Sequence, residues 1–259
     1  MRKNIYAVIV VYNKNCDESI TYNCLKDVKG INIILCDNSD PGFNNKNKLN
    51  LDDKVYIDMQ GNKGLSKAYN AAISTIKDYE GYVCLFDDDT TVTSKYFDEL
   101  KSLIDNNKSD IYLPIVSNSK GIMSPVQFRK YHVKRFDNIS NIKYEYLAGI
   151  NSGMAINLAL FKNYQYDENM FLDFIDYKFI LDMRKRDAKL HVMNTEIIQS
   201  FSIETNEIIS AKKRFKIKKK DLRYFYKDGL LLRLYYFYLI TRLKLGLLLR
   251  FKSLRILVW

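Results

Sequence analysis

Over about the first 115 residues, short apolar segments alternate with segments of helical pattern, and no other feature constrains the fold as strongly. The apolar segments are rich in β-branched residues without a polar face, which is typical of parallel strands buried on both sides. Connections this short between strands force parallel pairing and right-handed crossovers. The pattern predicts an α/β fold with a mostly parallel central sheet, whose first strands are Ile5–Tyr12, Ile31–Cys36, Val55–Met59, Tyr82–Phe86 and Ile111–Val116.

The helices expected between and after these strands are marked by polar starts and apolar spacing. Residues 118–148 are expected to form a β-rich insertion, and a further strand is expected over 189–193. From Lys212 onward the pattern is strongly helical. The predicted helices of the body cover residues 17–29, 65–77, 94–105 and 174–186.

Composition limits the class of protein and its compartment. The hydrophobic fraction of 47% and the charged fraction of 27% exclude wholesale disorder and a polytopic membrane protein. Four Cys without a CxxC pair argue against a disulfide framework or a zinc ribbon and favour a reduced, cytoplasmic location. The apolar run Ile5–Val11 is too short for the core of a signal peptide, so no export is expected.

The net charge of +11 is concentrated at the C-terminal end. Residues 211–259 hold 15 of the 41 Lys and Arg but 2 of the 30 Asp and Glu, a net of +13, whereas residues 1–210 sum to −2. The sequence therefore predicts a nearly neutral domain over 1–210 and a basic helical tail over 211–259. Such asymmetry points to a polyanionic partner, either a membrane surface or nucleic acid.

The tail has the pattern of a helix that lies on a membrane. The apolar segment Leu230–Leu249 is interrupted by Arg233, Arg242 and Lys244, and a bilayer span tolerates few charges. Long Leu runs suit lipid better than stacking on bases, so an anionic membrane surface is expected and nucleic acid is not. Packing on the body or on a second subunit, giving a homo-oligomer, is the alternative. Wrapped as one helix with a break near Gly246, six cations fall within an arc of about 120°: Arg223, Lys227, Arg233, Lys244, Lys252 and Arg255.

Polar clusters follow several of the predicted strands, and the carboxyl ends of parallel strands are where ligands bind in such sheets. Asp87-Asp88-Asp89 follows the fourth strand, and a hard divalent cation on diphosphate oxygens is bound by such carboxylates. A solvated acidic turn is the competing explanation. The other clusters at this edge are Asn13, Asp37-Asn38-Ser39 and Gly61-Asn62-Lys63-Gly64.

These other clusters have both a ligand-binding and a purely structural interpretation. Asp37 could accept a hydrogen bond from a uracil or thymine ring or from a ribose hydroxyl, although Asp and Asn also favour Asx-turns. The loop Gly61–Gly64 precedes a helix and offers backbone N–H groups, or is simply a turn before a helix. Asp173 and Asp176 flank a helix start; either could be a general base, but helix capping is the simpler explanation from these residues alone.

Taken together and in order, these motifs resemble the inverting family-2 glycosyltransferases, and within them the bacterial rhamnosyltransferase-like branch. The resemblance covers about residues 4–230. Many relatives have a His-containing segment after the last strand, where this chain reads Gln199-Ser200-Phe201-Ser202. The motifs that carry the resemblance are Val8–Asn13, Asp37–Ser39, Gly61–Asn70, Phe86–Thr90, Asn151–Ile156 and Met170–Asp176.

The resemblance implies a Rossmann-like nucleotide-sugar-binding domain and a role for each motif. Asp176 is then the catalytic base, with Asp173 in reserve, and Asp89 with Asp87 holds Mg²⁺ or Mn²⁺. Asn151, Ser152 and Gly153 are expected on the acceptor side. The donor-binding residues it implies are Asn13, Asp37, Asn38, Asn62, Lys63, Asp87 and Asp88.

The implied activity is inverting transfer of rhamnose or another hexose from a dTDP- or UDP-sugar to a glycan, with a lipid-linked oligosaccharide expected as acceptor. Its setting would be synthesis of a bacterial surface polysaccharide, such as capsule or O-antigen, at the inner face of the cell membrane. A galactofuranosyl-, glucosyl- or galactosyltransferase using a UDP-sugar is the near alternative. A nucleotidyltransferase or a nucleic-acid-binding protein is the remoter one.

Overall fold

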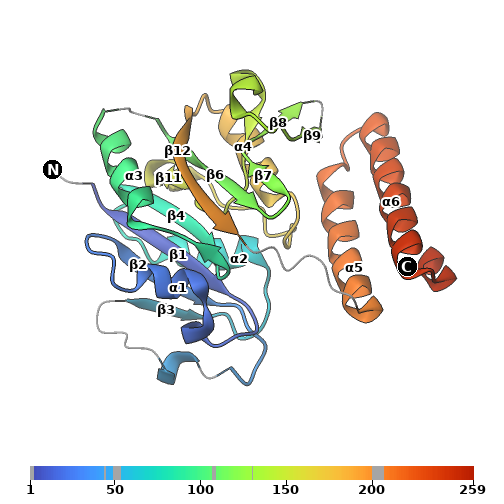
Figure 1. Cartoon of the computed structure of the whole chain (residues 1–259), viewed down its shortest axis with the longest axis horizontal. Coiled ribbons are helices and arrows are strands. Elements are labelled where there is room, and N and C mark those ends of the chain that lie inside the picture. The colour runs from blue at the N-terminus through green and yellow to red at the C-terminus, as the bar shows by residue number, and fades with distance from the viewer. Residues whose placement is uncertain (1–2, 44, 49–53, 107–108, 130, 200–206) are drawn as a thin grey trace.

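A nine-stranded mixed sheet is the centre of the computed structural model, which describes residues 3–43, 45–48, 54–106, 109–129, 131–199 and 207–259 (Figure 1). Four strands pair in parallel in the spatial order β3-β2-β1-β4, which confirms the mostly parallel α/β fold expected from the alternation. Their bounds are β1 Ile5–Val11, β2 Asn32–Asp37, β3 Val55–Asp58 and β4 Tyr82–Asp87.

Beyond β4 the sheet changes direction. Strand β11 (Ala155–Asn157) inserts antiparallel between β4 and β6. These two strands, the fourth and fifth expected from the sequence, are therefore not neighbours. Strand β12 then pairs in parallel with β6. The remaining strands of this sheet are β5 Thr90–Thr91, β6 Ile111–Asn118, β7 Gly121–Ser124 and β12 Leu190–Gln199, and a small separate sheet holds β8 Val126–Arg129, β9 His132–Lys134 and β10 Leu147–Ala148.

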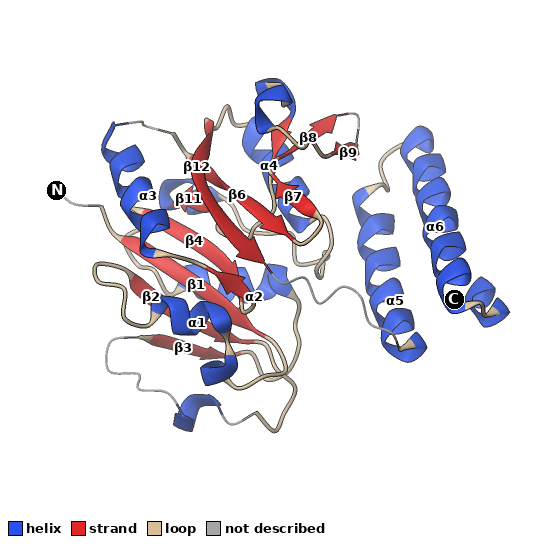
Figure 2. Ribbon diagram, viewed as in Figure 1, coloured by secondary structure: helices blue, strands red, loops and turns tan. Residues whose placement is uncertain are grey.

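Helices cover both faces of the sheet (Figure 2). Successive side chains of a strand point to opposite faces, and in the central strands the side chains on both faces are apolar and need to be covered. Ile5, Ala7 and Ile9 of β1 pack in one core with α1 and α3, whereas Val8 and Val10 pack in the other with α2 and α4. The helix bounds are α1 Ile20–Leu25, α2 Leu65–Ser74, α3 Ser94–Asn106 and α4 Ile175–Arg184.

The first helix is shorter than the sequence pattern indicates. The expected helix over 17–29 is divided into a 3₁₀ turn, Cys16–Glu18, and α1. The division falls at Ser19, whose side chain accepts a hydrogen bond from the backbone N–H of Tyr22 and so starts a new helix. Helix α1 ends at Leu25, five residues before the glycine that was expected to stop it.

Two long helices, α5 (Ile208–Phe225) and α6 (Leu230–Phe251), lie side by side next to the body (Figure 1). The boundary expected between residues 210 and 211 falls inside α5. Phe215, Leu222 and Phe225 are buried in the same apolar core as α2 and α4. The first tail helix is therefore packed on the body.

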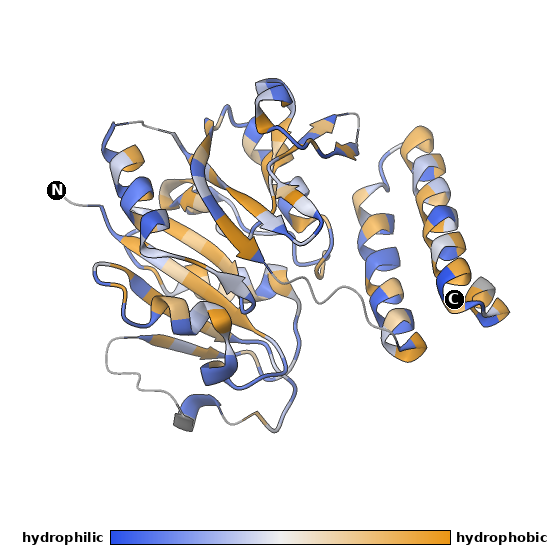
Figure 3. Cartoon of the chain, in the orientation of Figure 1, coloured by the Kyte–Doolittle hydropathy of each residue, from blue (hydrophilic) through white to orange (hydrophobic). Residues whose placement is uncertain are grey.

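C-terminal helices are present as expected, but the continuous helix on which the arc of cations was calculated is not, because the chain turns between α5 and α6. Gly229 has a φ of 97° and lies immediately before α6, whereas Gly246 lies within α6 and does not break it. The arc of six cations calculated for one continuous helix therefore does not form. Figure 3 shows apolar residues on several sides of α6. Within the described ranges, neither α6 nor any other helix combines the length and apolarity that a membrane span requires.

Candidate active site

The carboxyl ends of β1, β2 and β4 are joined by hydrogen bonds between the predicted motifs. The backbone N–H of Asn13 donates to Ser39 Oγ at 2.9 Å. Asp88 accepts from the backbone N–H of Tyr12 at 3.0 Å and from Lys14 Nζ at 2.7 Å. The structure thus brings three predicted clusters together at one edge of the sheet, and Asp88 serves there as a brace between strand ends.

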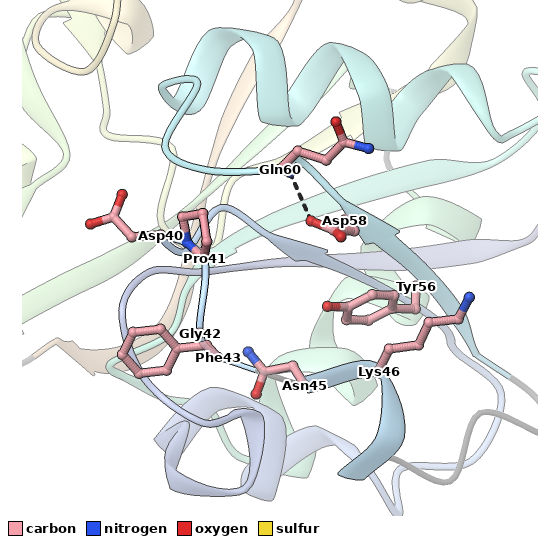
Figure 4. A pocket seen from close by; sticks show the side chains of 9 residues that line it. All are labelled: Asp40, Pro41, Gly42, Phe43, Asn45, Lys46, Tyr56, Asp58 and Gln60. Carbon is pink, nitrogen blue, oxygen red and sulfur yellow. Dashed lines mark hydrogen bonds between the residues drawn. The ribbon is translucent and has the colours of Figure 1, made fainter.

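Asp37 is buried at this edge and is hydrogen-bonded to Asn45 and Tyr56, two residues that line a cavity. Its carboxylate accepts hydrogen bonds from Asn45 Nδ2 and from the Tyr56 hydroxyl, both at 2.7 Å, and from the backbone N–H of Ser39 at 3.1 Å. A carboxylate has about four acceptor positions, so a fourth donor can still be accepted. The adjoining cavity has a volume of about 380 Å³ and is lined by Asp40, Pro41, Gly42, Phe43, Asn45, Lys46, Tyr56, Asp58 and Gln60 (Figure 4).

The loop before α2 is fixed by Asn38. The side chain of Asn38 accepts from the backbone N–H of Lys63 at 2.8 Å and donates to Asn62 Oδ1 at 3.2 Å. Gly64 has a φ of 88°, and a Cβ there would lie 2.7 Å from Phe171, so both the backbone angle and the space require glycine. The start of α2 is therefore pressed against the loop that leads to Asp173.

Asp87 and Asp89 lie beside Gln199, which is the last residue of β12. Gln199 Nε2 donates to Asp87 Oδ2 at 2.6 Å and to Asp89 Oδ1 at 3.3 Å. Burial, and then the charge of Asp89, raises the pKa of Asp87 to about 7. Burial and the charge of Asp88 also raise the pKa of Asp89. The predicted pair is thus a recessed, mutually repelling pair of carboxylates, which a cation would stabilise.

The oxygen atoms at this point suit a hard divalent cation. Mg²⁺ and Mn²⁺ prefer oxygen ligands and are often held by one or two carboxylates plus phosphate and water. The described residues hold no group of three or more His, Cys, Asp or Glu side chains arranged to bind a metal alone. Gln199 Oε1 is buried and has no hydrogen-bond partner among the described residues, so it offers a further oxygen next to Asp87 and Asp89. Ser200 to Ser202, which follow it, lie outside the described residues.

Asp176 is at the start of α4 and is recessed. Burial raises the pKa of Asp176 to about 7, with further increases from the charges of Asp173 and Asp87, while the backbone N–H of Tyr177 opposes the shift. A carboxyl group with a pKa near neutrality is suited to accept a proton. Asp173, the reserve candidate, is paired with the guanidinium of Arg214 in α5 through both carboxylate oxygens. Asp173 is thus engaged by α5, and the choice of Asp176 as the base stays a prediction.

Asp221 of α5 holds the loop before Asp176 and was missed by sequence reasoning. Its fully buried carboxylate accepts three backbone N–H bonds, from Phe171, Leu172 and Asp173, each at 2.8 Å. The carbonyl of Phe171 in turn accepts from the backbone N–H of Leu65 at 2.7 Å. One peptide of this loop thus connects the tail helix to the start of α2. The sequence feature that could have indicated this role is the single Asp221 among the Lys and Arg residues of this segment.

Two further buried groups around the site have no partner. Ser66 Oγ and the Tyr69 hydroxyl, one turn apart on α2, have no hydrogen-bond partner among the described residues. After burial, the charges of Asp87, Tyr166 and Asp176 raise the pKa of Tyr69, so its hydroxyl lies near two of the site carboxylates. Buried polar groups are nearly always hydrogen-bonded in the working protein, so an ordered water or a bound ligand is expected to supply the missing partner of each.

The segment predicted on the acceptor side is buried against the sheet. Ser152 Oγ and Thr90 Oγ1 are 2.9 Å apart. The backbone N–H of Gly153 donates to Leu85 O at 2.7 Å, and Asn151 Oδ1 accepts from the Tyr166 hydroxyl at 3.4 Å. These contacts fix the segment to β4 and β5, and an acceptor contact by any of the three residues stays a prediction.

The fold and the acidic strand end define the class of protein. Solved structures similar to this chain are glycosyltransferases of the A-type fold. One is S. aureus TarS in complex with UDP, with a TM-score of 0.58 and 15% identity over 85% of this chain and 64% of that chain. Another is GalNAc-T7 with UDP, GalNAc and Mn²⁺, with a TM-score of 0.59 and 14% identity over 77% of this chain and 44% of that chain.

The family model described as glycosyl transferase family 2 matches residues 6–164, and the chain belongs to this family. A curated relative, the dTDP-rhamnosyl transferase RfbF of Shigella flexneri, is 26% identical over 203 residues, which are 74% of this chain and 67% of the relative. The chain thus spans about two thirds of RfbF and 64% of the TarS chain. These comparisons confirm the family and fold that the ordered motifs predict.

Proposed function

We propose that this glycosyltransferase transfers a sugar from a nucleoside-diphosphate sugar to a glycan acceptor with inversion of configuration. The observation that carries the proposal is the meeting of Asp87, Asp89 and Asp176 at one edge of the sheet, with the pKa of Asp87 and of Asp176 each raised to about 7. The site thus has one acidic pair suited to a metal–diphosphate and one separate carboxylate suited to a proton.

The donor would occupy the edge between β1, β2 and α2. The cavity beside Asp37, which Phe43 and Tyr56 help to line, would take the base. Asn13, Asn38, Asn62 and Lys63 then line the path towards the diphosphate. Asp89 and Asp87 would hold Mg²⁺ or Mn²⁺, which when bound neutralises the charge of the leaving nucleoside diphosphate.

The chemistry at the acceptor follows from the recessed carboxylate. Asp176 removes the proton of the acceptor hydroxyl as its oxygen forms a bond to the anomeric carbon. The bond between that carbon and the diphosphate oxygen breaks on the opposite face, which inverts the configuration. Arg214 and Asp221 keep the loop of Asp173 in place while this occurs.

The sugar is expected to be rhamnose from a dTDP donor, because the relative named as a dTDP-rhamnosyl transferase is 26% identical. A UDP-hexose donor is the second candidate, since TarS was solved with UDP-GlcNAc. A screen of dTDP- and UDP-sugars by calorimetry, with Mg²⁺, Mn²⁺ or EDTA, tests the proposal. One nucleotide sugar should bind at least about tenfold more tightly with metal than with EDTA. No binding of any nucleotide sugar under any of these conditions would contradict the function.

The second helix of the tail supports a lipid-linked acceptor at the inner face of the cell membrane. Tyr236 and Ile240 of α6 are buried on the side that packs against α5, whereas the opposite side of the helix is also apolar and faces outward. Arg233 and Lys244 lie on one flank of this outer face and Arg242 on the other, at 100° per residue. An exposed apolar face with flanking cations suits an anionic bilayer surface. We define the outer face of α6 by its exposed apolar residues Leu230, Leu231, Leu234, Phe237, Tyr238, Leu245 and Leu249.

Changing Leu234 and Leu245 to Ser together is expected to weaken binding to phosphatidylglycerol vesicles by about tenfold or more. Each Leu side chain leaves water when the helix binds the bilayer, and Ser does not provide this favourable transfer. Co-sedimentation at low and high salt measures the effect, and binding should weaken as salt rises. Changing Ile20 and Ile198 to Ser, which are exposed apolar residues on α1 and β12, is the matched control. If the wild-type chain does not bind the vesicles and the α6 substitutions change only its dimerisation, this face is a subunit interface.

A further inference from the structure

The four residues directly before α4 all contact one side of α5. Asp221 accepts one backbone hydrogen bond from each of residues 171–173, at 2.8 Å. The ring centroid of Phe174, the fourth residue, lies 5.1 Å from that of Phe225. Asp221 and Phe225 are spaced i, i+4 and therefore lie on the same side of the helix. The whole segment that leads into α4 is thus held by one surface of the tail.

Phe174 is the N-cap residue of α4 and has an unusual backbone conformation. Its φ of 65° and ψ of 7° lie in the left-handed region, which is unfavourable for a bulky residue with a Cβ. Its carbonyl accepts the first hydrogen bond of the helix, from the backbone N–H of Lys178 at 2.9 Å, but its side chain caps no N–H group. An N-cap residue is usually extended and supplies a side-chain oxygen. The direction in which the chain enters α4 is therefore set by contacts from outside this helix.

The contacts that hold Phe174 come from the end of α5. Its ring packs against Phe225 and against Tyr226, whose centroid is 6.0 Å away, while Asp221 fixes the three peptide N–H groups that precede it. A left-handed residue of this kind persists only where its surroundings hold it. Asp176 follows two residues later, in the first turn of α4. A rotation of the backbone at Phe174 would therefore reorient the turn that carries the Asp176 carboxylate.

The way in which Asp221 holds the segment is costly for a purely structural contact. Its carboxylate is fully buried, and burying a charge costs free energy unless hydrogen bonds compensate for it. An apolar side chain would fill the same space without this cost. The three N–H bonds instead fix three successive peptides in one geometry. The buried charge and the left-handed Phe174 thus both act on the backbone just before Asp176, and strained backbone of this kind is concentrated at functional sites.

We propose that Asp221 is a positioning residue for the catalytic base, and that it acts through the left-handed backbone of Phe174 to set the direction of the Asp176 carboxylate. The inference rests on the proposed function, in which Asp176 takes the proton of the acceptor hydroxyl. A general base must lie within hydrogen-bond reach of that proton, and a displacement of about 1 Å can lower a rate by about a hundredfold. Asp221 itself contacts neither the acceptor nor the donor in this scheme.

Asp221→Asn is the first test, because Asn keeps the shape but has one acceptor oxygen in place of two. Phe171 donates to one carboxylate oxygen, and Leu172 and Asp173 donate to the other, so the variant loses at least one of the three bonds. The turnover number should fall by about tenfold or more, with the affinity for the nucleotide sugar changed by less than about twofold. Donor calorimetry counts the folded sites, so that a loss of folded protein is not mistaken for a loss of turnover.

Phe225→Leu is a second variant that keeps the charge of Asp221 and removes the ring packed on Phe174. It should lower the turnover number by about threefold or more, again with donor affinity unchanged. Phe215→Leu is the matched control, because Phe215 is another buried ring of α5 and packs against Trp259. It should lower the melting temperature to a similar extent but change the turnover number by less than about twofold.

The decisive measurement repeats Asp221→Asn in the Asp176→Asn background. A residue that acts through the base has nothing to position once the base is removed, so the residual rate should change by less than about twofold. Should Asp221→Asn fail to fold, Phe225→Leu is compared in the same two backgrounds. An equal loss of rate in both backgrounds, or an unchanged turnover number in the wild-type background, would overturn the inference while the proposed function stands. If the wild type binds no nucleotide sugar, the proposed function fails and this inference fails with it.

Discussion

Changing Asp176 to Asn is expected to lower the turnover number by about two to four powers of ten, which is the usual contribution of a general base. Asn has nearly the same shape but cannot take the proton of the acceptor hydroxyl. Binding of the nucleotide sugar should be almost unchanged, because Asp176 is not one of the carboxylates expected to hold the cation and the diphosphate. Initial-rate kinetics together with donor calorimetry separates these two effects.

The pH dependence gives a second readout for the same residue. Because burial raises the pKa of Asp176 to about 7, the base is increasingly protonated below that pH and wild-type turnover should fall as pH decreases. The raised pKa stabilises the fold below about pH 4, and this contribution is lost as pH rises through about 7. Asp176→Asn should therefore melt at a higher temperature than the wild type at pH 8.

Asp173→Asn is the control that tests the assignment of the base. It removes the partner of Arg214 and should loosen the loop 171–173 with a smaller loss of turnover than Asp176→Asn. A chain that stays active with Asn at 176 but loses turnover with Asn at 173 would move the base to Asp173.

Changing Asp89 to Ala is expected to abolish transfer and to remove the metal dependence of nucleotide-sugar binding. Without Asp89 the cation loses its expected direct ligand, and the diphosphate charge would face Asp87 and Asp88 without neutralisation. Calorimetry of the donor with Mg²⁺, Mn²⁺ and EDTA measures the loss. In the wild type, metal-dependent binding should also weaken below about pH 7, because protons compete for Asp87, whose pKa is raised to about 7.

Asp98→Ala is the matched control for this change, since Asp98 is an exposed carboxylate on α3. It should leave both transfer and metal-dependent binding unchanged. Full transfer activity of the wild-type chain in EDTA would show that no cation takes part, and the role given to Asp89 would then be wrong.

The core of the fold could be predicted because each parallel strand is marked by its own apolar run in the sequence. Runs such as Ile5–Val11 and Tyr82–Phe86 are apolar on both faces, and only a doubly covered sheet buries both. Strand β11 could not be placed in the same way. A strand of three residues carries too little sequence pattern to indicate its partners. Its position between β4 and β6 depends on pairing with residues that lie more than forty positions earlier in the sequence.

The candidate site likewise has residues that could be predicted and residues that could not. Asp37, Asp87 and Asp89 stand at strand ends, so the topology alone brings them to one edge. Asp221 and Gln199 could not be found this way, because their roles depend on how α5 and β12 pack against loops distant in sequence. The tail was misjudged for a related reason: the pattern shows which residues are apolar, but not that one apolar side of α6 is covered by α5.

The three backbone hydrogen bonds accepted by Asp221 also have a consequence for the order in which the protein becomes active during synthesis. The strands of the sheet, the loop before α2 and Asp176 itself all precede Asp221 in the chain. A nascent chain can therefore complete its sheet while the loop 171–173 still lacks the carboxylate that fixes it. Catalytic competence should appear only once α5 has been made and has docked. By that stage the helix that follows it, with its outer apolar face, is the next segment to emerge.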